Sequence, residues 1–111
     1  MIDWMRVNEL VDEIGAEDFD EVVELFLMEV DHAIGLLEEG ASNPVVVEEQ
    51  LHFLKGAALN LGFETMAQLC NKGEKAAAAR RPDVVSAEEV RQIYASSRAQ
   101  FERELPKRLA A

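Results

Sequence analysis

Cysteine, proline and glycine are scarce in this sequence. Its 111 residues include one cysteine, Cys70, with three prolines and six glycines. A single cysteine cannot form a disulfide within the chain, which is consistent with a reducing compartment. No stretch approaches the roughly 18 consecutive apolar residues of a membrane-spanning helix, and the first residues lack the basic segment and apolar run of a secretory signal. We therefore expect a cytoplasmic protein that does not enter a membrane.

Basic residues are nearly absent from the first half of the chain. Residues 1–49 hold 15 Asp or Glu and one basic residue, Arg6, for a net charge of −14, whereas residues 50–111 hold 7 acids and 10 Lys or Arg, for +3. The overall charge of −11 argues against general binding to nucleic acid or to an acidic membrane, both of which need a basic surface. The asymmetry indicates either an interaction face that steers a partner or a pair of solvated helix faces.

Apolar residues recur at intervals of three and four along most of the chain, which is the period of an amphipathic helix. No stretch alternates at period two for long enough to predict a strand. The 49% hydrophobic content is enough to bury a core, so we expect residues 1–111 to form a single domain.

Helix start and stop signals divide the chain into five segments. The start signals are capping boxes and an Asn-Pro pair, formed by Asp18 with Glu21, Asn43 with Pro44, and Ser86 with Glu89. Pro106 is expected to end or bend the last helix. The expected helices span residues 3–14, 18–39, 44–61, 64–80 and 86–105. Short connections favour antiparallel neighbours, so the predicted fold is all-α: an antiparallel up-down-up-down four-helix bundle with the short N-terminal helix across one end.

His52 has the most informative surroundings of the two histidines. The core stripe of its helix comprises Val47, Leu51, Leu54, Ala58 and Leu61. At 100° per residue, His52 lies about 140° from the centre of this stripe, so its side chain should project into solvent. Lys55 follows three residues later and Gly56 four later, on the adjoining turn.

These three residues suit reversible acceptance of a phosphoryl group. A neutral imidazole nitrogen is a nucleophile near neutral pH, and Lys55 supplies a positive charge beside it. Gly56 costs about 1 kcal/mol relative to Ala inside a helix, but it removes bulk where a partner would approach the ring. The alternative is an ordinary surface histidine and lysine, with Gly56 required for close helix packing.

The segment HFLKGAALNLG, residues 52–62, resembles the signature of histidine-containing phosphotransfer (HPt) domains, roughly H-x-L-K-G-[SA]-[SA]-x-x-[LIVMF]-G. The resemblance implies a phosphocarrier without kinase activity of its own. By the same resemblance, His52 would be the phosphoacceptor through Nε2, Lys55 would hold the phosphoryl oxygens, and Gly56 would give the partner access to His52. Ala57 and Ala58 stand where many members carry serine, which excludes a hydroxyl contribution from these positions.

The resemblance also implies the partners, which are response-regulator receiver domains and a sensor histidine kinase. The receiver would supply the aspartate, the acidic pocket and Mg²⁺, so no cofactor is expected on this chain. The sequence has no Gly-rich phosphate loop or kinase ATP-binding block, and no His or Cys pair with metal-ligand spacing. We expect a monomer. Two alternatives are an interaction module that binds receivers without being phosphorylated and the phosphoacceptor domain of a chemotaxis-type or hybrid sensor kinase, although the length and Met1 favour a free-standing protein.

The second histidine, His32, lies among Leu25, Met28 and Leu36 on a second apolar strip of helix 18–39. Either the helix over residues 3–14 packs over this strip and His32 borders it, or part of the strip stays exposed and docks the receiver beside His52. The solvent exposure of the three apolar side chains distinguishes the two hypotheses.

Overall fold

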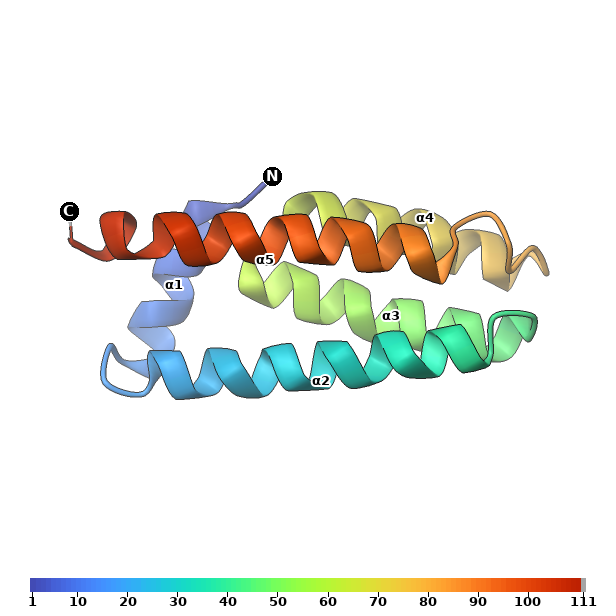
Figure 1. Cartoon of the computed structure of the whole chain (residues 1–111), viewed down its shortest axis with the longest axis horizontal. Coiled ribbons are helices and arrows are strands. Elements are labelled where there is room, and N and C mark those ends of the chain that lie inside the picture. The colour runs from blue at the N-terminus through green and yellow to red at the C-terminus, as the bar shows by residue number, and fades with distance from the viewer. Residues whose placement is uncertain (111) are drawn as a thin grey trace.

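The structure is a computed structural model that describes residues 1–110. These residues form five helices and no strand: α1 (Trp4–Ile14), α2 (Phe19–Glu39), α3 (Pro44–Leu61), α4 (Glu64–Ala78) and α5 (Ala87–Ala110). Helices α2 to α5 run alternately in opposite directions along the long axis, and α1 crosses the bundle at one end (Figure 1). The predicted fold class is confirmed. None of the described helices is long and apolar enough to cross a membrane.

The starts of three helices test the capping signals. The Asn43 side chain accepts a hydrogen bond from the Val45 N–H at 3.0 Å, and Ser86 and Glu89 form a reciprocal capping box with both bonds at 3.1 Å. The capping box predicted at Asp18 is wrong, because the backbone of Asp18 is already helical and its side chain makes no capping hydrogen bond.

The predicted ends of the last two helices are also wrong. Helix α4 ends at Ala78 instead of residue 80, and the backbone of Arg80 is left-handed, with φ of 67°. Helix α5 continues through Pro106 to Ala110. Proline removes one backbone hydrogen bond, but contacts with α1 hold the helix on both sides of it. The Trp4 ring stacks on Phe101 with ring centroids 6.0 Å apart, and the Arg108 guanidinium lies 5.0 Å from the centroid of the Trp4 ring.

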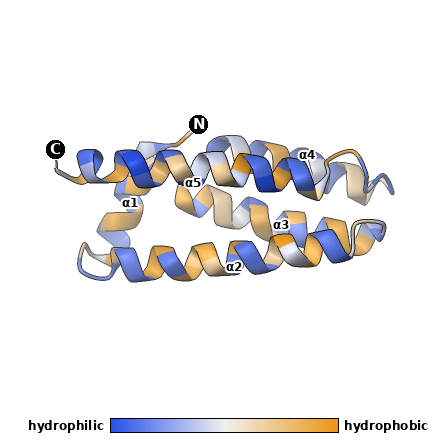
Figure 2. Ribbon diagram, viewed as in Figure 1, coloured by the Kyte–Doolittle hydropathy of each residue, from blue (hydrophilic) through white to orange (hydrophobic). Residues whose placement is uncertain are grey.

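The core lies between the four long helices and extends under α1. All five residues of the predicted α3 stripe are buried, as are Val7 and Leu10 of α1. Hydrophobic residues appear on every turn of α2, whereas much of the α5 ribbon is hydrophilic (Figure 2). Helix α2 therefore carries more apolar surface than the core requires, and Leu25 and Met28 remain exposed.

Two glycines allow close packing, one at the end of α3 against the N-terminal segment and one in α4 against α3. Gly62 ends α3 with φ of 77°, and a Cβ there would lie 2.7 Å from the backbone oxygen of Asp3. In the interior of α4, a Cβ at Gly73 would lie 2.6 Å from Leu51 Cδ1 and 2.9 Å from Val85 Cβ. The short α3–α4 connection and the bare backbone at Gly73 thus bring the middle of α4 against the middle of α3, where His52 lies.

Candidate functional site

His52 projects from the middle of α3 into solvent, as predicted. Its side chain is 70% exposed, while the flanking residues Leu51 and Leu54 are fully buried. The ring is not free to rotate at random, because its Nδ1 lies 2.7 Å from Oε2 of Glu74 on α4. One nitrogen of an otherwise exposed imidazole is therefore fixed by the neighbouring helix.

Glu74 also contacts Lys55, so one carboxylate joins both predicted polar residues of the site. The Nζ atom of Lys55 lies 2.7 Å from Oε1 of Glu74, and the Lys55 and Glu74 side chains are 26% and 17% exposed. Burial of the Glu74 carboxyl opposes its ionisation, but the adjacent Lys55 ammonium and His52 ring outweigh this effect and lower the pKa of Glu74 below its ordinary value. Glu74 is therefore a carboxylate at neutral pH.

The ionised Glu74 determines which nitrogen of His52 carries the hydrogen. A carboxylate is only an acceptor, so Nδ1 of His52 must donate in the 2.7 Å contact. In the neutral ring this leaves the lone pair on Nε2, and that atom is on the exposed side chain. The arrangement can present a nucleophilic nitrogen to a partner and stabilise positive charge that develops on the ring when that nitrogen forms a bond.

Gly56 is exposed, and its lack of a side chain has no packing cause within the chain. A Cβ built at Gly56 would meet no atom within 4 Å. The alternative in which Gly56 is required for close helix packing is therefore wrong. In contrast, Gly73 does meet that requirement. Because Gly56 has no side chain, nothing at this position projects from the helix surface beside His52.

The sequence interpretation missed Glu74. It lies 22 residues after His52, on another helix, and spacing rules for a single helix do not connect the two. A weak signal is present in the sequence. The buried residues of α4 include Met66, Cys70 and Ala77, and Glu74 follows Cys70 by four residues, so an acid occupies a position at which helical periodicity expects an apolar residue.

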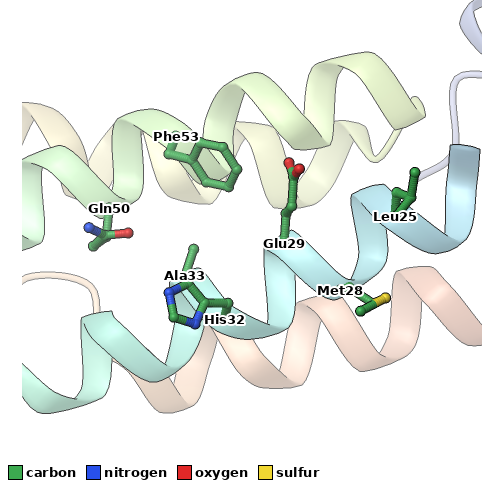
Figure 3. A pocket seen from close by; sticks show the side chains of 7 residues that line it. All are labelled: Leu25, Met28, Glu29, His32, Ala33, Gln50 and Phe53. Atoms are coloured by element: carbon green, nitrogen blue, oxygen red, sulfur yellow. The ribbon is translucent and has the colours of Figure 1, made fainter.

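The second apolar strip of α2 is not covered by α1. Leu25 and Met28 are 54% and 65% exposed, His32 is exposed, and Leu36 is partly buried. The alternative in which the N-terminal helix packs over the strip is therefore wrong. His32 does not join His52, but it lines a hollow of about 580 Å³ between α2 and α3 (Figure 3). We call this hollow the α2–α3 groove; its lining residues are Leu25, Met28, Glu29, His32, Ala33, Gln50 and Phe53.

A second hollow lies next to the groove and is lined in part by His52. It has a volume of about 300 Å³, and it shares Glu29 and Phe53 with the groove. Its other lining residues are Phe26, His52, Gly56, Ala57 and Asn60. The exposed apolar surface of α2 and the imidazole thus line two adjacent hollows.

Cys70 behaves as the small core residue that the sequence predicts. It is fully buried, and its burial raises the pKa of the thiol to about 12. Within residues 1–110, no group of three or more His, Cys, Asp or Glu side chains is placed to hold a metal ion.

The comparisons with known proteins give one match. The sequence model of the Hpt domain family matches residues 21–105, which include α3 and α4 and most of α2 and α5. No curated protein and no solved structure matches the chain.

Proposed function

The chain belongs to the Hpt domain family, and from this premise we propose that it accepts a phosphoryl group on Nε2 of His52 and exchanges it with the aspartate of a response-regulator receiver domain. Members of the family are phosphocarriers in phosphorelay signalling and are generally not independent enzymes. We further propose that the chain acts as a monomer, as one domain over residues 1–111, in the cytoplasm. A sensor histidine kinase is the expected original source of the phosphoryl group.

The observation that carries this proposal is the Glu74 carboxylate, which lies 2.7 Å from both Nδ1 of His52 and Nζ of Lys55. Nδ1 donates to the carboxylate, so the Nε2 lone pair faces outward. In the forward step Nε2 attacks the phosphorus of an aspartyl phosphate, the N–P bond forms, and the P–O bond to the aspartate breaks. The aspartate leaves as a carboxylate, and the ring becomes a cation that retains its hydrogen on Nδ1.

Glu74 stabilises the ring cation in this step, because its negative charge is already in place before the reaction. No proton needs to leave the site, and the reverse step needs none to enter. In an exposed histidine without such a partner, no protein group would fix the tautomer, and only solvent would balance the positive charge on the ring.

Lys55 supplies a positive charge for the phosphoryl oxygens. It lies one turn after His52, and its ammonium group rests on Oε1 of Glu74. An incoming phosphoryl group brings negative oxygens near this ammonium, so Lys55 can turn from the carboxylate to those oxygens. Phosphoryl transfer depends mainly on such positioning and charge neutralisation, and the receiver supplies the aspartate, the acidic pocket and Mg²⁺.

The intact triad of His52, Glu74 and Lys55 argues against the second candidate, a module that binds receivers without being phosphorylated. An interaction surface alone gives no reason for a carboxylate to hold one imidazole nitrogen and leave the other exposed.

The test is transfer of labelled phosphate from a phosphorylated receiver domain. Wild-type protein should acquire an acid-labile label, and His52→Gln should acquire none. His32→Gln is the control for which histidine is labelled, because it removes the other exposed histidine of the chain and should still acquire the label; its rate is not compared, since His32 lines the α2–α3 groove. Equal labelling of wild type and His52→Gln would contradict the proposal.

The role of Lys55 is tested by Lys55→Ala. We expect slower transfer with helical content unchanged, because the Lys55 side chain pairs only with Glu74 among the described ion pairs and is not part of the core. Loss of helical content, measured by circular dichroism, would instead show that Lys55 is structural.

A further inference from the structure

We propose that the end of α4 and the loop after it bind an acidic segment of a partner protein, at a surface separate from the one that presents His52. We call this surface the basic end of α4; its residues are Lys72, Lys75, Arg80 and Arg81. It lies toward the end of the bundle opposite α1 (Figure 1). The inference does not depend on the proposed function, because it assigns a second binding surface to the same chain.

The four side chains of the basic end are exposed cations without partners. Among the described residues, none of the four takes part in an ion pair or a side-chain hydrogen bond. The chain holds 22 acids and 11 Lys or Arg, so acids outnumber cations two to one. Of the other seven cations, six pair with an acid, namely Arg6, Lys55, Arg91, Arg98, Arg103 and Arg108. In so acidic a chain, four neighbouring cations without a partner indicate a charge directed to another molecule.

Arg80 is held in a backbone conformation that favours glycine. Its φ is 67°, the only positive φ outside glycine among the described residues. The N–H groups of Arg80 and Arg81 donate to the carbonyls of Ala77 and Ala76, both at 2.9 Å, which is the Schellman motif that ends many helices. The left-handed position of this motif is usually glycine, because a Cβ is strained there. Helix α3 ends in this way on Gly62, whereas α4 keeps an arginine.

The helix dipole does not account for Arg80. A cation in the last turn of a helix offsets the partial negative charge of the carbonyl end, and Lys75 already lies in the last turn of α4. Arg80 is two residues past Ala78, the last residue of the helix, and the effect of the dipole declines within the last turn. The strained arginine is therefore better explained by the use of its exposed charge than by the stability of α4.

The two lysines face away from His52. Glu74 marks the side of α4 that contacts His52. At 100° per residue, Lys75 lies about 100° and Lys72 about 160° around the helix from Glu74. The two arginines lie beyond the end of the helix. A partner bound at the basic end of α4 therefore leaves His52 accessible.

The acids at the same end of the bundle restrict what can bind. They include Asp83 in the loop, Glu39 on α2 and Glu49 on α3, all exposed and without an ion pair among the described residues. A membrane or a long nucleic acid is an extended anionic surface that would meet these acids together with the cations. A short acidic segment of a protein can contact the cations alone. The planar guanidinium groups of Arg80 and Arg81 suit paired hydrogen bonds to its carboxylates.

The test is binding of a short, fluorescein-labelled poly-glutamate peptide to the full chain, followed by fluorescence anisotropy. Single-stranded DNA and phosphatidylserine vesicles are the other anionic probes. The quadruple Gln variant combines Lys72→Gln, Lys75→Gln, Arg80→Gln and Arg81→Gln. Lys75→Gln alone and Lys107→Gln form a matched pair. Each removes an exposed lysine from the last turn of a helix, and neither lysine has an ion pair among the described residues.

We expect the peptide to bind the wild type with an affinity that falls as the salt concentration rises. The quadruple Gln variant should bind about tenfold more weakly, which is the sum of four weak, exposed ion pairs. Lys75→Gln should lose about twofold, and Lys107→Gln should bind like the wild type. Labelling of His52 by a phosphorylated receiver should be unchanged in all three variants.

Arg80→Gly tests whether the arginine is retained at a cost. It removes the charge and the strain together, so it should weaken peptide binding and raise the unfolding temperature by about 4 °C. A lower unfolding temperature would show that Arg80 supports the end of α4, which overturns the inference. If circular dichroism shows that the quadruple Gln variant has lost helical content, Lys75→Gln and Arg80→Gly still test the surface.

The remaining outcomes also overturn the inference. The basic end of α4 is not a binding surface if the wild type and the quadruple Gln variant bind the peptide equally, or if neither binds it. Tighter binding of DNA or vesicles through the same four residues would assign the surface to a nucleic acid or a membrane. Slower labelling of His52 in the quadruple Gln variant would show that the two surfaces are not separate. Absence of labelling in the wild type contradicts the proposed function alone.

Discussion

Oε2 of Glu74 lies 2.7 Å from Nδ1 of His52, although the two residues are 22 positions apart in the sequence. This contact converts an exposed histidine into one with a defined tautomer and a fixed counter-charge. It exists because Gly73 allows α4 to approach Leu51 on α3, one residue before His52. The reactivity proposed for this site therefore depends on how two helices pack, and the first prediction concerns the carboxylate itself.

Replacing Glu74 should slow phosphoryl transfer in a graded way. Glu74→Ala removes both the hydrogen bond to Nδ1 and the negative charge, whereas Glu74→Gln keeps an oxygen that can accept from Nδ1. We expect Glu74→Ala to lose about 1 kcal/mol of stabilisation, or about fivefold in the rate of labelling, and Glu74→Gln to lose less. Quenched-flow labelling measures the rates, and ¹⁵N chemical shifts of the His52 ring report the tautomer.

The control for these variants is Glu64→Ala, which removes an exposed acid from the same helix. If Glu74→Ala and Glu64→Ala transfer at the same rate, Glu74 does not position His52. A change in the His52 shifts without any change in rate would show that the tautomer is fixed by Glu74 but does not limit the reaction.

The lowered pKa of Glu74 predicts a pH dependence of stability. Relative to the ordinary value of 4.5, the pKa of Glu74 is lowered in the folded chain. Ionised Glu74 therefore stabilises the fold above about pH 4.5, and this stabilisation is lost as the pH falls through the lower folded value. Urea unfolding should give the wild type a higher free energy of unfolding than Glu74→Gln near neutral pH. The difference between the two should become smaller as the pH falls.

Glu24→Gln serves as the comparison for that measurement, because Glu24 is an exposed acid on α2 without an ion pair among the described residues. Its stability relative to the wild type should change less with pH. A difference between wild type and Glu74→Gln that stays constant from neutral to acid pH would show that the carboxylate contributes nothing through its charge.

The sequence was sufficient for the features that depend on a single helix. The apolar period of three and four located all five helices, and the position of His52 opposite the core stripe of α3 correctly predicted its exposure. Pro106 and Asp18 show where local rules fail. Contacts of α1 with Phe101 and Arg108 stabilise α5 on both sides of Pro106, so the helix continues through the proline. The backbone of Asp18 is already helical, so its side chain does not cap α2.

Features that depend on two helices were not available from spacing. The approach of Glu74 to His52 needs the rotation and separation of α3 and α4, and the exposure of Leu25 and Met28 needs the direction in which α1 crosses the bundle. Both are set by tertiary packing. The sequence offered two hypotheses for the strip around His32, and only the packed structure chose between them.

Gly73→Ala should destabilise the protein. The added Cβ would lie 2.6 Å from Leu51 Cδ1 and 2.9 Å from Val85 Cβ, so the side chains or the helix must move. Overpacking of this kind costs about 1–3 kcal/mol, which exceeds the gain of up to about 1 kcal/mol from replacing a helical glycine. Thermal unfolding measures the net effect. A rise in the unfolding temperature would mean that α4 can shift away from α3 at little cost, and the His52 shifts would then report whether Glu74 moved with it.

Gly56→Ala should have the opposite effect on stability and a negative effect on function. A Cβ at Gly56 meets nothing within 4 Å, so the helical preference of alanine should raise the free energy of unfolding by about 1 kcal/mol. The methyl group would stand in the hollow beside His52, where the partner must approach, and labelling by a phosphorylated receiver should slow.

Gly35→Ala separates these two effects. Gly35 also lies inside a helix, a Cβ there also meets nothing within 4 Å, and Gly35 does not line either hollow. It should therefore stabilise the fold by a similar amount and leave labelling at the wild-type rate. If both variants label alike, the bare backbone at Gly56 is not what admits the partner. If only Gly56→Ala is slow, the glycine is retained at the expense of stability for access to His52, because the packing of this chain does not require it.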